Sequence, residues 1–166
     1  MPCSTNRPTT AFDRSELDSP IAVLYIPVRL LRLDGWDRMA STHQSNVETV
    51  RTVYEGFNEG DLESVLATMA ENVEWVEPVG FVFAGTYHGP DAVRANVFVP
   101  AMERFETFRV EPDRFIDGGD TVVAVGTFHA TTEDGERIES PFAHVNELHD
   151  GHITRFVNYT DTALWR

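Results

Sequence analysis

Hydrophobic residues recur at helical spacing where the chain first becomes clearly patterned. Val47, Val50, Tyr54 and Phe57 fall three or four positions apart within residues 43–58, which places them on one face of an amphipathic helix. The run Asn-Glu-Gly-Asp that follows is typical of a helix end. The pattern therefore predicts a first helix with one apolar side available to a core.

Shorter segments follow this helix. Asp61 is a suitable N-cap for a second helix over residues 62–70. Residues 72–78, Asn-Val-Glu-Trp-Val-Glu-Pro, alternate between polar and apolar positions and predict a strand. A glycine-punctuated loop with room for a short hairpin then covers residues 79–89.

A third helix is expected over residues 90–105. Pro90 suits the first position of a helix, because the N–H that proline lacks would have no partner there. Pro100 lies inside the same segment, where the missing N–H and the ring disturb helical geometry. We therefore predict a kink or break near residue 99.

The last third of the chain alternates as β-strands. Asp134-Gly135 and Asp150-Gly151 are typical of tight hairpin turns between such strands. Helices followed by a long antiparallel meander predict an α+β fold with helices packed on one face of a sheet. The expected strands cover residues 108–117, 121–132, 137–149 and 152–161.

One strand carries an unusual face. In Pro-Phe-Ala-His-Val-Asn-Glu-Leu-His-Asp-Gly, residues 141–151, alternation places His144 and Asn146 on the side of Phe142 and Leu148. An imidazole and an amide among apolar side chains indicate either a polar pair bonded inside the core or a face that meets a ligand. The neighbouring strands decide between these interpretations.

Two-residue turns predict which residues face one another across the hairpins. They place His144 opposite Val125 and Val157, and a one-residue bulge would move some neighbours to the other face. A mixed apolar and polar surface of this kind is typical of a ligand pocket, while a half-buried core histidine is the competing interpretation. The predicted face carries Val125, Thr127, His129, Ser140, Phe142, His144, Val157, Tyr159 and Asp161.

The charge balance excludes several partners. The chain has 13 basic residues, all arginine, against 27 acidic ones, for a net charge of -14. Such a protein repels the phosphates of nucleic acids and anionic membranes, so neither is expected as a partner. Abundant acid without lysine resembles proteins of salt-loving archaea, and we expect high salt to stabilise the fold by screening.

Cysteine content and hydropathy point to the cytoplasm. The single cysteine, Cys3, rules out an intramolecular disulfide and a cysteine-based metal site. No apolar run reaches the roughly 18 residues of a membrane span. Residues 21–31 are apolar but contain a proline and an arginine and lack a cleavage site, so they make a poor signal peptide.

The chain changes character near Met39. Residues 1–38 are rich in Pro, Ser and Thr, carry no net charge and show no sustained period. They are interpreted as a disordered leader or as an extension translated from a misassigned start. A strand over 21–26 that pairs with the domain edge is the alternative. Residues 39–166 form the expected domain.

Three motifs in this domain resemble a known family. They are Phe-Asn-Glu-Gly-Asp-Leu-Glu-Ser-Val-Leu-Ala-Thr-Met-Ala-Glu-Asn-Val-Glu-Trp, then Gly-Thr-Tyr-His-Gly before the third helix, and Asp-Gly followed by a strand ending in Tyr-Thr-Asp. Over residues 43–165 the chain resembles the SnoaL-like, ketosteroid-isomerase-related proteins of the NTF2-like superfamily. The resemblance implies a cone, in which a curved antiparallel sheet wraps three helices around an internal apolar cavity.

The resemblance also implies a range of activities without a cofactor. Members catalyse polyketide cyclisation, steroid isomerisation, epoxide hydrolysis or dehydration, or only bind ligands and dimerise. In the cyclases an Asp seven residues before the Gly of the Asp-Gly turn serves as the acid/base. In this chain that position, counted from Gly151, is His144. This departure places cyclase activity in doubt but keeps a group able to transfer protons.

The candidate catalytic residues are His144 as general base, because an unperturbed imidazole titrates near neutrality, and Asp161 as the group that orients it. An Asp at the end of a strand is also a common cap for the following turn, which is the alternative role for Asp161. His149 and His152 flank a turn, and without a third ligand no metal site is expected. The residues expected to line a substrate pocket are Tyr54, Phe57, Trp75, His88, His129, Phe142 and Tyr159.

Two functions remain open at this point. One is a cofactor-free isomerase, cyclase, dehydratase or hydrolase acting on a small apolar carbonyl or hydroxyl compound. The other is a non-catalytic module that binds a small apolar ligand or dimerises. A homodimer is expected through the outer sheet face, for which the predicted register selects Val122, Ala124, Gly126, Phe128, Ala143, Val145 and Phe156.

Overall fold

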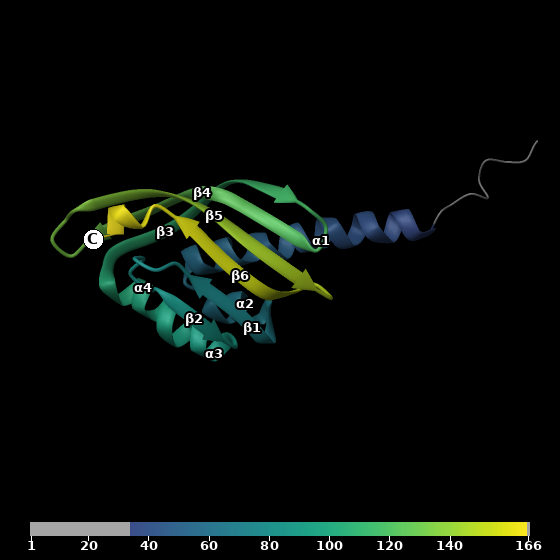
Figure 1. Ribbon diagram of the computed structural model, residues 1–166, viewed down its shortest axis with the longest axis horizontal. Coiled ribbons are helices and arrows are strands. Elements are labelled where there is room, and N and C mark those ends of the chain that lie inside the picture. The colour runs from purple at the N-terminus through teal and green to yellow at the C-terminus, as the bar shows by residue number, and fades with distance from the viewer. Residues whose placement is uncertain (1–33, 166) are drawn as a thin grey trace, which may run out of the picture. The chain divides into compact units, whose positions relative to one another are not determined.

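The computed structural model describes residues 34–165 of the chain, which form helices packed on a single sheet (Figure 1). The helical segments are α1 (Asp34–Glu59), α2 (Leu62–Ala67), α3 (Pro90–Val93), the π-helix η3 (Arg94–Phe98), α4 (Val99–Arg104) and the 3-10 helix η4 (Thr162–Trp165). The strands are β1 (Met69–Glu77), β2 (Gly85–His88), β3 (Phe105–Asp117), β4 (Thr121–Thr132), β5 (Arg137–His149) and β6 (His152–Thr160).

The proposed leader falls almost entirely outside the described residues. Helix α1 begins at Asp34, ahead of Met39, so the expected boundary lies within this helix. The interpretation of residues 1–33, including the possible strand over 21–26, stays a prediction. Within the described part of the chain, no helix is both long and apolar enough to cross a membrane.

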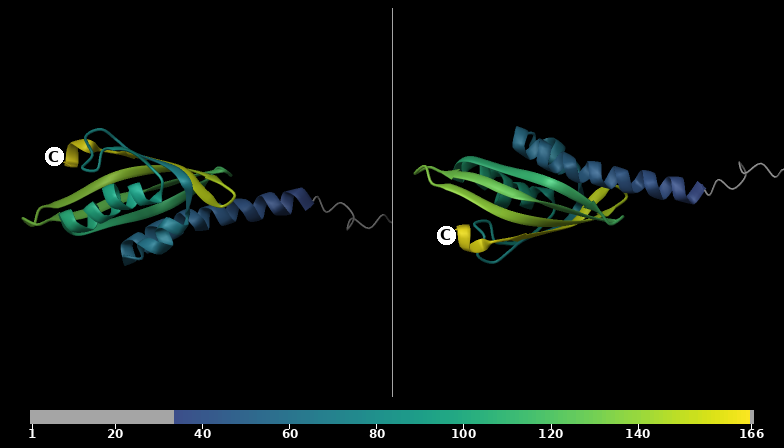
Figure 2. Two further views of the ribbon diagram at one scale, coloured as in Figure 1. Left: turned by 90° about the horizontal axis from the view of Figure 1, so that it is seen from below. Right: turned by 90° about the horizontal axis from the view of Figure 1, so that it is seen from above.

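The sheet has the order β2-β1-β6-β5-β4-β3 and confirms the α+β class. The meander β3 to β6 is antiparallel throughout, as the hairpin signals predict. One pairing is not antiparallel, because β1 runs parallel to β6 and joins the first half of the domain to the last strand. Helix α1 packs along one face of the sheet, while α3 contacts β1 and β2 and the chain continues through η3 to α4, which contacts β3 (Figures 1 and 2).

Pro100 produces a local change of helix type. The segment 94–98 is a π-helix, and the Val99 N–H bonds to the Arg94 carbonyl, five residues back. Pro100 then stands in the first turn of α4, where the N–H it lacks is not needed. The predicted break near residue 99 is thus confirmed, and it takes the form of a π segment that turns Val97 and Phe98 into the interior.

The predicted register between β4 and β5 was wrong by one residue. The turn is longer than two residues: Thr131 pairs with Arg137, and the Thr132 and Glu136 backbones bond across the loop. Because side chains alternate, this shift exchanges the two faces of β4. Phe128, opposite Ser140, therefore points inward, whereas His129, opposite Glu139, points outward.

A bulge changes β6 in the same way. His149 faces His152 as predicted, but the pairing shifts between Glu147 and Leu148. His144 is consequently opposite Asn158 and not Val157. Asn158 is turned inward with 2% of its surface exposed, while Tyr159 points outward with 58% exposed. An extra residue at Thr154 is the physical cause.

Most of the residues predicted for the dimer face are not on the outer side of the sheet. Only Ala143 and Val145 of the predicted set are on the outer side of the sheet. Val122, Ala124, Phe128 and Phe156 are buried in the core against the helices, and Gly126 is buried as well.

Candidate functional site

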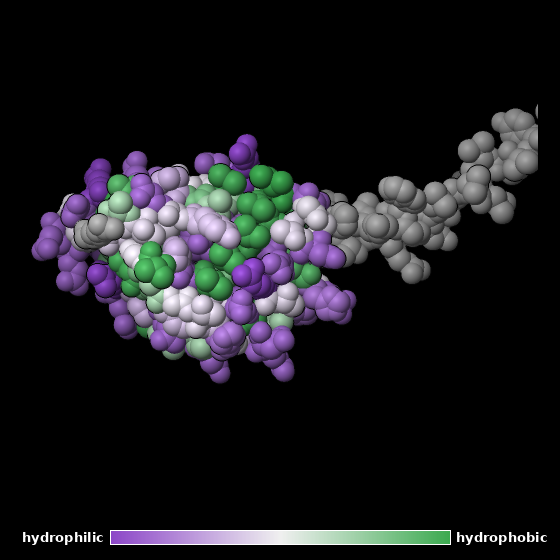
Figure 3. All heavy atoms as spheres, viewed as in Figure 1, coloured by the Kyte–Doolittle hydropathy of each residue, from purple (hydrophilic) through white to green (hydrophobic). Residues whose placement is uncertain are grey.

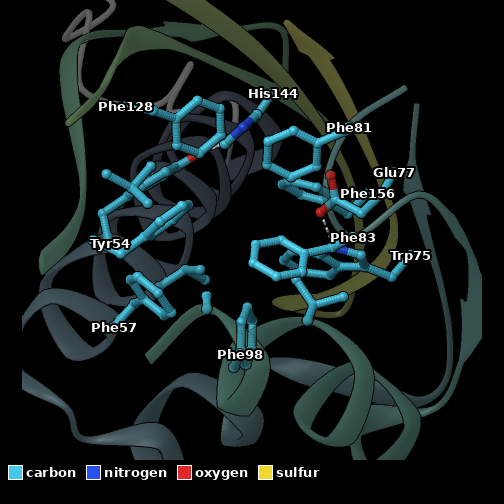
Figure 4. A pocket seen from close by; sticks show the side chains of 15 residues that line it. Tyr54, Phe57, Trp75, Glu77, Phe81, Phe83, Phe98, Phe128, His144 and Phe156 are labelled. Atoms are coloured by element: carbon cyan, nitrogen blue, oxygen red, sulfur yellow. Dashed lines mark hydrogen bonds between the residues drawn. The ribbon is translucent and has the colours of Figure 1, made fainter. Parts of the chain in front are cut away.

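An aromatic cavity lies between the inner face of the sheet, helix α1, the η3 segment and the loop that connects β1 to β2 (Figure 4). It offers about 50 Å³ to the centres of water-sized molecules, several times the space that one buried water needs. Its aromatic wall consists of Tyr54, Phe57, Trp75, Phe81, Phe83, Phe98, Phe108, Phe128 and Phe156.

Glu77 is a buried carboxyl group on this wall. It ends β1, where alternation with Val73 and Trp75 turns it inward, and 5% of its surface is exposed. The Trp75 indole Nε1 donates to one carboxyl oxygen at 2.7 Å, and Asn158 Nδ2 donates to the other at 2.8 Å. Burial raises the pKa of Glu77 from an ordinary 4.5 to about 7, and these two hydrogen bonds offset only part of that effect.

His144 is the second titratable group of the cavity. Its ring stacks on Phe142 with centroids 4.0 Å apart and meets Phe156 edge-on at 4.8 Å. Burial lowers the pKa of His144 from 6.5 to about 3, although the Asn158 side chain acts in the opposite direction. The imidazole is therefore neutral at physiological pH, because desolvation disfavours its charged form.

Tyr54 joins helix α1 to this histidine. Its hydroxyl lies 3.1 Å from His144 Nδ1, and its ring stacks on the imidazole with centroids 5.9 Å apart. Burial raises the pKa of Tyr54 above its ordinary value of 10.0, so the phenol keeps its proton. In Figure 4 Tyr54 and Glu77 stand on opposite sides of the open space. A molecule in the cavity would lie between a hydroxyl donor and a carboxyl group.

The predicted pocket residues fall into two groups. Tyr54, Phe57, Trp75 and His144 line the cavity. Phe142 is buried directly behind the His144 ring. The question raised by residues 141–151 thus has a definite answer, because this face of β5 meets both the aromatic core and the cavity.

The other predicted residues are outside the cavity. His129 lies on the outer face, 3.6 Å from Glu111 and 3.8 Å from Glu139. Asp161 is exposed, and its carboxylate accepts a hydrogen bond from the Ala163 N–H, as expected for a turn cap. The structure therefore does not bring Asp161 to His144.

His88 and Tyr159 are also away from the cavity. His88 ends β2 with an exposed side chain, and Tyr159 projects from the outer face of β6. Among residues 34–165, no three His, Cys, Asp or Glu side chains gather in a way that could hold a metal ion.

Sequence reasoning missed Glu77 and Asn158. For Glu77 a signal exists, since it shares the parity of Val73 and Trp75 in an alternating strand and so belongs to the buried face. For Asn158 no local signal exists, because the bulge in β6 reverses the parity counted from the turn. Both side chains matter to the site, because they form a buried hydrogen bond between strands β1 and β6.

The curved six-stranded sheet, the helices on its inner face and the apolar cavity between them define an NTF2-like protein. A family model of the SnoaL-like domain matches residues 50–156, and the chain belongs to this family. A search of curated proteins found no match.

Solved structures agree with this assignment. An NTF2-like protein from Burkholderia thailandensis is 33% identical with a TM-score of 0.69, over 72% of this chain and 92% of that one. An NTF2-like protein of unknown function from Burkholderia pseudomallei is 36% identical with a TM-score of 0.66, over the same shares. TerC, co-crystallised with polyporic acid, is 32% identical with a TM-score of 0.66, over 72% of this chain and 93% of that one.

Proposed function

We propose that this protein is a cofactor-independent enzyme that moves a proton on a small, largely apolar carbonyl or hydroxyl compound held in the cavity. The observation that supports this most directly is the buried carboxyl of Glu77, whose pKa of about 7 allows it both to accept and to return a proton near neutral pH. The apolar wall selects the ligand class, since only a few polar groups interrupt it.

The general-base role proposed from the sequence for His144 passes to Glu77. An imidazole whose pKa is lowered to about 3 binds a proton weakly at neutral pH, whereas the Glu77 carboxylate binds one readily. In this proposal His144 holds the Tyr54 hydroxyl in place through the 3.1 Å contact at Nδ1. Asp161 takes no part, because it is exposed and caps the C-terminal turn.

The proposed reaction follows from the positions of the Glu77 carboxyl and the Tyr54 hydroxyl on opposite sides of the cavity. Glu77 accepts a proton from the carbon next to a carbonyl, and the electron pair of the broken C–H bond moves onto the carbonyl oxygen. Once Glu77 holds the proton, the Tyr54 hydroxyl donates a hydrogen bond to the negatively charged oxygen, which is effective in an apolar site. Glu77 then returns the proton to a different carbon, which yields an isomer, or to a leaving hydroxyl, which yields a dehydrated product.

A relative supports a ligand of organic type. TerC, 32% identical to this chain, was co-crystallised with polyporic acid. We infer that the cavity of this chain also receives an organic molecule with an oxygen function, and the aromatic wall fits such a ligand through stacking and edge contacts.

Glu77→Gln tests the proposal. The amide keeps the size of the side chain but cannot take up a proton, so we expect turnover of small ketones, enones or lactones to fall by about 10²–10⁴-fold. Glu74→Gln is the matched control, because Glu74 lies on the same strand and pairs with Arg155 outside the cavity. Turnover that survives in Glu77→Gln would contradict the proposal. Compounds that raise the melting temperature of the native protein without being converted would instead indicate a binding module.

We also propose a homodimer through the outer face of β4, β5 and β6, the side of these strands that points away from the helices. Val123, Val145 and Val157 lie side by side across β4, β5 and β6, and Val125, Ala143 and Tyr159 form the next row. Figure 3 shows hydrophobic residues gathered on the face formed by these strands. Tyr159 is exposed, Val157 is buried and the other four are half-buried, and a partly exposed apolar surface of this kind is typical of an interface.

Light scattering at micromolar concentration in high salt measures the assembly. We expect twice the chain mass of 18.7 kDa for the native protein and a single chain mass for Val145→Asp. The substitution places a charge in the middle of the apolar row, where a partner would bury it. A native protein that is monomeric under these conditions would refute the dimer.

A further inference from the structure

Two buried polar atoms on neighbouring strands have no hydrogen-bond partner among the described residues. They are His144 Nε2 and Asn158 Oδ1. His144 and Asn158 are direct neighbours across the β5–β6 pair, a position in which side chains are about 5 Å apart at Cβ. The Asn158 side chain also raises the pKa of His144.

With Glu77 ionised, the hydrogen bonds have one direction. A carboxylate only accepts, so the Asn158 amino group faces Glu77 at 2.8 Å and the amide oxygen is left for His144. An amide oxygen requires a donor, which His144 supplies if its neutral imidazole carries the proton on Nε2 and turns it toward Asn158. His144 Nδ1 is then an acceptor, and the Tyr54 hydroxyl donates to it across 3.1 Å. In this form Tyr54 has no hydrogen left for a ligand.

With Glu77 protonated, the directions reverse. The carboxylic O–H can donate to an amide oxygen, so Asn158 presents its oxygen to Glu77 and its amino group to His144. Nε2 becomes the acceptor, and the imidazole proton resides on Nδ1, from which it is donated to the Tyr54 oxygen. The Tyr54 O–H is released toward the cavity. One proton has been gained, on Glu77, and the imidazole still holds one, which exchanges between its nitrogens through water.

We infer that Asn158 is a positioning residue that couples the protonation of Glu77 to the tautomer of His144 and thereby to the direction in which Tyr54 donates. Its benefit to turnover rests on the proposed function: once Glu77 has taken a proton from the substrate, Tyr54 is free to stabilise the oxyanion. The coupling itself exists without a substrate. It gives the buried amide of Asn158 a role that packing alone does not explain.

Few other groups can produce such a change. The titratable side chains that line the cavity besides Glu77 are Tyr54 on α1 and His144 on β5, and Tyr87 on β2 senses the charge of Glu77. Burial, and secondarily the charge of Glu77, raises the pKa of Tyr87, and burial raises that of Tyr54, so both phenols stay protonated near neutrality. The β1–β2 loop and η3 contribute Phe81, Phe83, Val97 and Phe98 to the cavity, none of which titrates.

Long-range ¹H–¹⁵N NMR of the ¹⁵N-labelled full chain tests the coupling, because the imidazole ¹⁵N shifts distinguish the two tautomers and the imidazolium. The signals of His144 are assigned by their loss in His144→Gln. We expect the Nε2–H form well above pH 7 and the Nδ1–H form below it, with a midpoint near the pKa of about 7 for Glu77 and no imidazolium down to pH 5. A pH-independent tautomer, or conversion to imidazolium in this range, would overturn the inference.

Variants test whether the pH response of His144 depends on the Asn158 side chain. Asn158→Leu and Asn158→Ser should each leave His144 in one tautomer throughout, as should Glu77→Gln, whose amide does not titrate. Asn72→Leu, an exposed asparagine on β1, should retain the native pH response. A response that persists in both Asn158 variants would refute the positioning role. Since none of these spectra requires a substrate, failure of the coupling is distinguishable from a native protein that shows no turnover.

Discussion

Gly126→Ala should destabilise the protein by about 3 kcal/mol or more, at the upper end of overpacking effects. A Cβ at this position would lie 2.6 Å from Pro112 Cα and 2.8 Å from Phe142 Cζ, and closer still to the Glu111 carbonyl oxygen. Two of these contacts are with backbone, which cannot move without separating β3 from β4. The irregular pairing between Pro112 and Arg114 shows that β3 bends across this position.

Urea denaturation of Gly126→Ala measures this cost. Thr127→Ala is the matched control, because its side chain points to the other face of the same strand and a surface change of this kind stays within about 0.5 kcal/mol. A loss below about 1 kcal/mol for Gly126→Ala would mean that β3 does not approach β4 as closely as described. The result bears on the site because β4 carries Phe128, which forms part of the cavity wall.

Replacing either Glu77 or His144 should change how the free energy of unfolding depends on pH. Glu77 has a folded-state pKa of about 7 against an ordinary 4.5, so its favourable contribution is complete below 4.5 and is lost as the pH rises through 7. His144 has a folded-state pKa of about 3 against 6.5, so its contribution is complete above 6.5 and is lost as the pH falls through 3. Between about pH 4.5 and 6.5, the contribution of Glu77 falls with pH while that of His144 rises, so the two changes nearly cancel.

In each single variant, the free energy of unfolding should follow the pH dependence of the one titratable group that remains. At roughly 1.4 kcal/mol per pH unit, His144→Gln is expected to lose about 3 kcal/mol of unfolding free energy, relative to native, as the pH rises from 4.5 to 7. Glu77→Gln is expected to lose about 3 kcal/mol, relative to native, as the pH falls from 6.5 to 4.5. Urea denaturation across this pH range gives the unfolding free energy of each variant relative to native. The effect of the acidic surface is the same in all three proteins and cancels in these differences. Curves that run parallel to the native one would show that neither side chain titrates as a buried group.

Local patterns predicted most of the elements. The strand limits 121–132 and 137–149 are as expected from alternation and from the Asp-Gly turns, and Pro100 correctly marked the change in the third helix. The inward direction of His144 was also predictable, because it depends only on the parity of β5 relative to Phe142 and Leu148. These features follow from the sequence because each is decided by residues close together in the chain.

The composition of the site was decided by tertiary structure. One extra residue in the β4–β5 turn and one bulge in β6 exchanged the faces of two strands, which removed His129 and Tyr159 from the cavity, brought in Phe128 and turned Asn158 inward to Glu77. Such a shift changes few local interactions, so its outcome depends on which face fits the helices. Glu77 has its shifted pKa only because β1 pairs in parallel with β6 and buries it beside Asn158. Desolvation depends on packing between distant segments, and no local pattern records it.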